Sequence, residues 1–200
     1  MQAALNAFEA SMLRVRALHA LHGSFSKQVT AAIDLSDLLR AEIVLGVSAL
    51  DHYVHELARL GMLECWAGTR KGTEAFNRFP LPISIAGALS NPSTAQQSIE
   101  AEIRSKHSFV SFQHPDRIAE AIRLFSDVKL WEQVAMHLGT TTKEIKTSLL
   151  LIVDRRNKIA HEADIDPSFP GQRWPIDSVL VEDTLDKLDA IARAIFKAIK

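Results

Sequence analysis

Cysteine is nearly absent from this 200-residue chain, which contains one, Cys65. A single cysteine cannot form an intrachain disulfide, and the Cys-x-x-Cys spacing of structural zinc sites is missing. Glycine-rich phosphate-binding loops of the Walker type are missing too. We therefore expect a protein of a reducing compartment, the cytoplasm, with no metal and no cofactor.

Long hydrophobic runs are also missing. The longest uncharged stretch, residues 81–99, is interrupted by Pro82, Pro92 and several polar residues, which a bilayer-spanning helix would not tolerate well. The first 21 residues carry Glu9 and two arginines without the order of a secretory signal. No membrane partner is expected.

Net charge is low as well, with 23 Lys and Arg against 24 Asp and Glu. This balance excludes a polycationic coat for nucleic acid but leaves room for a local basic patch. The hydrophobic share of 47% and charged share of 24% are those of a globular chain that buries a core, and the length fits one domain, residues 1–200.

Apolar residues recur at spacings of three and four through most of the sequence, which predicts helices. A helix at about residues 1–22 should stop at Gly23, and a long one over residues 35–63 should begin at Ser36 as N-cap and end near Gly61. Shorter helices are predicted at residues 98–110, 115–125 and 130–138, after an irregular insertion at about residues 64–95.

Two further helices complete the expected fold. One should begin at Thr141 or Thr142, where Glu144 fits a capping box, and run to about His161. The last should cover about residues 178–200, after a loop that contains prolines. No alternating strand of useful length appears. The prediction is an all-α helical bundle with short connecting helices.

Polar residues suddenly crowd the end of the helix that runs to His161. Four apolar residues at 149–152 are followed closely by the stretch from Asp154 to Asp164, with Arg156, Asn157 and His161 inside it. Positions five apart lie roughly 140° apart around a helix, so Arg156 and His161 of one chain diverge on a straight helix. A symmetric site between two subunits would accommodate this geometry.

Arg156-Asn157-x-x-x-His161 matches the arginine-polar-xxx-histidine motif of HEPN domains, the all-helical domains of many prokaryotic ribonucleases, toxins and CRISPR-associated effectors. Residues 49–56, 112–115 and 153–164 extend the likeness. Together they resemble the RiboL-PSP-HEPN subfamily, over roughly residue 38 to the C-terminus.

The resemblance implies a HEPN-like helical bundle that cleaves RNA without metal, as a homodimer with a composite site. Arg156 and His161 would be the catalytic residues, with Asn157 assisting. Histidine titrates near neutral pH and can act as base or acid, and the arginine fork matches phosphate oxygens. A toxin or defence effector of this kind could have an antitoxin or a regulatory protein as partner.

Other charged residues are candidates for a supporting role. Arg155, Lys158 and Glu162 flank the motif. Asp51 and His55 are four residues apart on the long helix and share a face, so either could support the site, whereas no matching ligand pair completes a metal site.

The charges near the motif are unevenly distributed. Residues 143–162 contain five basic and three acidic side chains, whereas residues 162–189 contain eight acidic and two basic ones. The acidic segment does not suit an RNA-binding surface and could attract a basic partner.

Two other readings of the motif remain open. Arg156 and His161 could be solvated residues of a helix terminus, where basic side chains interact favourably with the helix dipole. The chain could also be a HEPN domain that binds nucleotide or protein without cutting RNA.

Overall fold

The computed structural model describes residues 1–30 and 33–200, and within them the chain is all-α, apart from one isolated β-bridge between Ile165 and Arg173. The long helices are α1 (Gln2–Phe25), α2 (Ser36–Trp66), α8 (Thr142–His161) and α9 (Ser178–Ile199). The shorter ones are α3 (Glu74–Asn77), η1 (Ile83–Ile85), α4 (Ala86–Leu89), α5 (Pro92–His107), α6 (Pro115–Arg123) and α7 (Leu130–Leu138).

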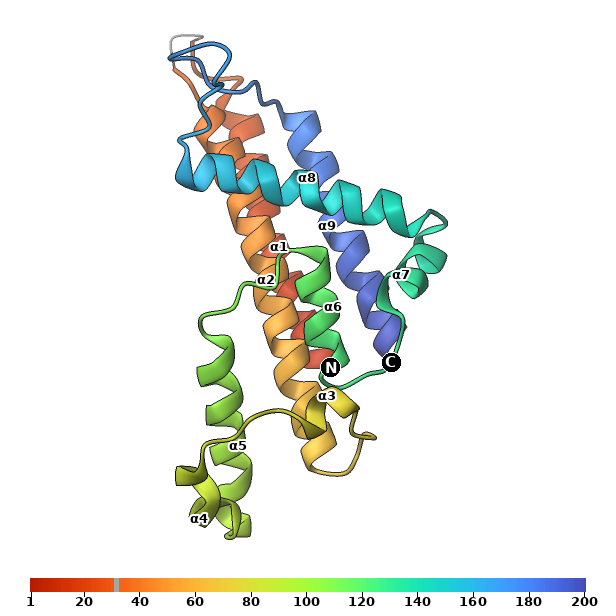
Figure 1. Cartoon of the computed structure of the whole chain (residues 1–200). Helices are drawn as coiled ribbons and strands as arrows, with labels where there is room; N and C mark the ends of the chain where they lie inside the picture. Colours follow the sequence, from red (N-terminus) through yellow and green to blue (C-terminus); the bar gives the residue numbers. More distant parts are fainter. Residues whose placement is uncertain (31–32) are drawn as a thin grey trace.

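Helices α1, α2 and α9 lie side by side and form the body of the bundle, and α8 crosses it (Figure 1). Their apolar faces share one core, in which Phe8 of α1 contacts Tyr53 of α2 at a ring-centroid distance of 5.3 Å. The buried Tyr53 hydroxyl donates to the Ala192 carbonyl of α9, so its polar end is satisfied within the core.

Close packing at the far end of α2 depends on Gly61. A methyl group added there would lie 2.1 Å from the ring of Phe125, which follows α6. The absent side chain therefore lets this aromatic ring lie directly on the helix backbone.

A second, smaller core lies beside the C-terminal half of α2. It consists of Met62, Ile99 and Ile103, with partly buried apolar side chains around them. Figure 1 shows α4 and α5 extending past the end of the bundle on this side. The predicted insertion therefore contains short helices, but it is confined to the residues between Trp66 and Pro92.

Several predicted boundaries were wrong. Gly23 does not end α1, which continues to Phe25, because a glycine is tolerated inside a helix at modest cost. Ser36 is the first residue of α2 and not its N-cap, since its hydroxyl accepts a hydrogen bond from Arg40. The same helix passes Gly61 and ends at Trp66. The capping box of Thr141 and Glu144 is confirmed.

Candidate functional site at the end of α8

The candidate site lies at the C-terminal end of α8, where the buried face of the helix becomes polar. Leu149, Ile152 and Val153 are buried against the core. Arg156 follows them at spacings of three and four, so it continues the same stripe and is half-buried. Its guanidinium therefore lies at the edge of the core.

Arg156 is held by its neighbour and not by an acid. Its Nη1 donates to Oδ1 of Asn157 at 3.0 Å, and its buried Nε has no hydrogen-bond partner among the described residues. Ten of the thirteen arginines form ion pairs, and Arg156 is not one of them in the part of the chain that the structure describes. Its charge remains available to an anion.

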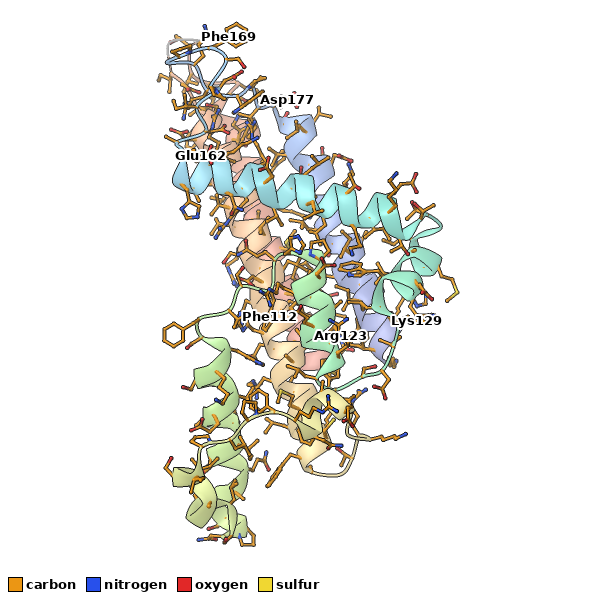
Figure 2. All side chains as sticks on the ribbon, viewed as in Figure 1. Phe112, Arg123, Lys129, Glu162, Phe169 and Asp177 are labelled. Carbon is orange, nitrogen blue, oxygen red and sulfur yellow. The ribbon has the colours of Figure 1, made fainter. Side chains whose placement is uncertain are left out.

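His161 is the last residue of α8 and is exposed. Within residues 1–30 and 33–200, no hydrogen bond or ion pair joins it to Arg156. The Arg156 side chain is half-buried and the His161 side chain is exposed, as expected of positions about 140° apart on a helix. A single chain thus presents these two groups in different directions. Figure 2 labels Glu162, the next residue, at the edge of the molecule.

Arg155, a predicted supporting residue, takes part in a structural ion-pair network. Its Nη2 donates to Oδ2 of Asp164 at 2.8 Å, and the same oxygen accepts from Nε of Arg40 at 2.7 Å. Burial lowers the pKa of Arg155, and the carboxylate of Asp164 opposes that effect. Through these two bonds Asp164 ties the end of α8 to α2. Because Asp164 is fully buried, a ligand cannot reach it.

The turn after α8 holds Asp164 in an unusual conformation. Ala163 and Asp164 have φ angles of 51° and 59°, in the left-handed region that residues with a Cβ adopt at a cost. The N–H groups of Glu162 and Asp164 both donate to the carbonyl of Lys158. These bonds and the buried ion pairs keep the strained turn in place.

The side chain of Lys158 makes contacts within the fold, whereas Glu162 contributes through its backbone. Nζ of Lys158 lies 2.9 Å from Asp154 and 5.4 Å from the ring centre of Trp174, so its charge is already occupied. Glu162 is exposed, and its backbone caps the helix end.

Asp51 and His55 lie elsewhere on α2. The carboxylate of Asp51 accepts from the N–H of Phe112 at 2.6 Å and from the amide of Gln113 at 3.0 Å, which fixes the loop between α5 and α6. His55 follows Arg40 by fifteen residues, a rise of about 22 Å along the helix. Within the described ranges, no hydrogen bond or ion pair links Asp51 or His55 to the motif.

Half of the eight acidic side chains in residues 162–189 form ion pairs within the described parts of the chain. Asp164 pairs with two arginines, Asp177 is the N-cap of α9, and Asp183 and Asp189 pair with basic side chains one turn along α9. Asp186 pairs with Arg16 of α1. These contacts offset part of the negative charge, so the segment is a weaker partner surface than the sequence indicated.

Arg40, Asp164 and Trp174 were missed by sequence reasoning. A charged Arg40 among the apolar positions of α2 was the available signal, since a buried arginine requires an acidic partner. Its partner is 124 residues away, and only the tertiary fold brings the two together.

Comparisons of the chain with protein-family models, with curated proteins and with solved structures find no match. In the described parts of the chain, no group of three or more His, Cys, Asp or Glu side chains is arranged to hold a metal ion, and no helix is long and apolar enough to cross a membrane. The geometry of the site is therefore what indicates the function of this protein.

Proposed function

We propose that this protein is a metal-independent endoribonuclease of the HEPN type, which acts as a homodimer in a toxin or defence system. The observation that carries the proposal is the arrangement at the end of α8. Within six positions of one helix end lie an arginine that has no acidic partner in the described parts of the chain, an asparagine bonded to it and an exposed histidine.

These three side chains suit RNA cleavage by the neighbouring 2′-hydroxyl. That reaction needs a base for the hydroxyl, an acid for the departing 5′-oxygen and positive charge on the phosphorane-like transition state. His161 can exchange the protons, and Arg156 can donate two parallel hydrogen bonds to phosphate oxygens. Asn157 uses its carbonyl oxygen to hold Arg156, which leaves its amide N–H groups for the phosphate.

Two copies of the chain are needed because each supplies a single motif histidine. A two-fold axis near the end of α8 would bring two copies of His161 and two of Arg156 to one phosphate, so that one imidazole acts as base and the other as acid. The divergence of Arg156 and His161 within one chain supports such a shared site.

The test is cleavage of labelled total RNA by the purified protein. We expect His161→Ala to abolish cleavage and EDTA to leave the unmutated protein active. His137→Ala is the matched control, because His137 is an exposed histidine in the last turn of α7. Loss of cleavage on chelation would refute the metal-free mechanism, and equal activity of His161→Ala would refute the site.

Oligomeric state and toxicity are separate tests. Light scattering should give a mass of about twice the 22.2 kDa of one chain. Expression in a bacterial host should stop growth, and the His161→Ala variant should not. A monomer at working concentration would rule out the shared site.

The alternative is a non-catalytic HEPN module that binds nucleotide or a regulatory partner such as an antitoxin. The pairing of Arg156 with Asn157 favours this binding function, because both side chains can bind a phosphate without any proton transfer. Binding of RNA or nucleotide that depends on Arg156, with no cleavage of any RNA, would identify this function.

A further inference from the structure

A polar pocket of about 280 Å³ lies between α2 and α5, outside the candidate site. His52 and His55 of α2 line one wall, and Arg104, His107 and Ser108 line the other. The volume is just below the range of about 300–1,000 Å³ that is usual for small-molecule sites, so it suits a ligand the size of one aromatic ring system.

Two of the three imidazoles of this pocket, those of His55 and His107, pack against an aromatic neighbour. The ring of Phe112 lies 4.5 Å from that of His55 and 5.3 Å from that of His107, measured between centroids. Within residues 1–30 and 33–200, no hydrogen bond occupies the ring nitrogens of His52, His55 or His107. Burial lowers the pKa of His107, with a further contribution from His55, which favours the neutral ring. A neutral imidazole offers one donor and one acceptor.

The charged groups of the pocket neutralise one another. Arg59 donates to Glu56 and Glu100, and Arg104 contacts the same two carboxylates. With two guanidinium groups matched by two carboxylates, the wall has little net charge to attract a phosphate. The pocket therefore favours an uncharged ligand with hydrogen-bonding edges.

Phe109 follows the residues that line the pocket, and 95% of its surface is exposed. It is two residues beyond the end of α5, directly after the lining residues His107 and Ser108. The loop that carries it is held on α2 by the hydrogen bonds that Phe112 and Gln113 donate to Asp51, and Figure 2 labels Phe112 there. A large aromatic ring on an anchored loop is a ready stacking surface.

We propose that this pocket is a subsite for one unpaired base of the RNA, which stacks on Phe109 and bonds through its edge to the imidazoles of His52, His55 and His107. Aromatic stacking combined with edge hydrogen bonds is the usual way in which proteins hold splayed-out bases. The inference rests on the proposed function in that it makes RNA the ligand.

The subsite would lie several nucleotides from the cleaved phosphate. Arg40 bonds to Asp164 just beyond α8, and His55 is about 22 Å further along α2, the length of about six stacked nucleotides. An RNA strand that follows α2 can thus contact both places, and the base in the pocket would set the position of the cut.

The experiment measures binding separately from cleavage. A fluorescein-labelled RNA of about 12 nucleotides, uridine-only or adenine-only, is titrated with the full-length His161→Ala protein, which should leave it uncut. Adding Phe109→Ala should weaken binding about tenfold, whereas Phe109→Trp should preserve binding and show fluorescence quenching by the stacked base. Ile83→Ala is the control, because Ile83 of η1 is 92% exposed and belongs to a different helix from the residues that line the pocket.

The possible outcomes distinguish the subsite from the ribonuclease function. If Phe109→Ala binds as tightly as its parent while the unmutated protein cleaves RNA, the subsite is refuted and the ribonuclease stands. If Phe109→Ala weakens binding but no RNA is ever cut, the subsite stands and the ribonuclease is refuted. Absence of both binding and cleavage refutes both.

Discussion

Asp164 accepts a hydrogen bond from Arg40 at 2.7 Å, which joins the turn after α8 to the first turns of α2. The same oxygen accepts from Arg155, and both guanidinium groups also donate to the carbonyl of Trp174. One buried carboxylate therefore fixes the position of the helix end that carries Arg156 and His161.

Asp164→Asn should lower the free energy of unfolding by about 3 kcal/mol, because the buried guanidinium of Arg40 and the partly buried one of Arg155 lose their counter-charge. Urea denaturation followed by circular dichroism measures this. Asp183→Asn is the control, since Asp183 pairs with Lys187 on the exposed face of α9 and should matter little. Equal stability of the two variants would show that the buried network is not important for folding.

Ala163→Gly should raise the free energy of unfolding by about 1 kcal/mol, because glycine adopts a φ of 51° without a Cβ clash. Ala160→Gly, three residues earlier inside α8, should have the opposite effect and lower it by about 1 kcal/mol. Thermal melting of the two variants gives the comparison. A loss of stability in both would contradict a strained turn.

Arg156→Ala should reduce the rate of RNA cleavage about 100- to 1000-fold, the usual cost of removing one preorganised charge from a transition state. Arg156→Lys should restore only part of the rate, because an ammonium group lacks the planar fork. Single-turnover cleavage kinetics provides the measurement. Arg14→Ala, an exposed arginine of α1 without an ion pair among the described residues, should cleave normally.

Glu42 should make stability depend on pH. It is completely buried and accepts a hydrogen bond from His19 at 2.8 Å. Burial raises its pKa above the ordinary value of 4.5, although His19 opposes the shift. A raised carboxyl pKa contributes stability that is complete below pH 4.5 and is lost as pH rises through the pKa of the folded protein.

Glu42→Gln removes this dependence, since glutamine resembles the protonated acid. The variant should therefore gain stability relative to the unmutated protein as pH rises from 4.5 towards neutral. Urea midpoints measured across that window test the sign. The exposed Glu182→Gln should show a constant difference, and the same flat profile for Glu42→Gln would contradict a raised pKa.

Helix positions could be predicted from the sequence because local signals determine them. The capping box at Thr141 and the left-handed glycine after α7, Gly139, mark boundaries that the structure confirms. The end of α2 could not be predicted in this way. Gly61 looked like a stop signal, yet it lies inside the helix, where its missing side chain makes room for the ring of Phe125.

The candidate site could likewise be predicted only in part from the sequence. Arg156 and His161 stand out as a motif in one short segment, and their diverging directions follow from helix geometry. The sequence could not show that Arg155 joins a buried network while Arg156 has no ion pair among the described residues, because both are arginines at adjacent positions. Only the position of Asp164 relative to Arg40 distinguishes them.

The separation of the small core around Ile99 and Ile103 from the main one has a consequence for local unfolding. Helix α5 contacts the bundle through α2, and few apolar side chains join the two. Opening of this arm needs less free energy than unfolding of the bundle, so amide protons near Ile103 should exchange with solvent well before those near Leu50. The pocket between α2 and α5 would then open and close more often than the helix end that carries His161 unfolds.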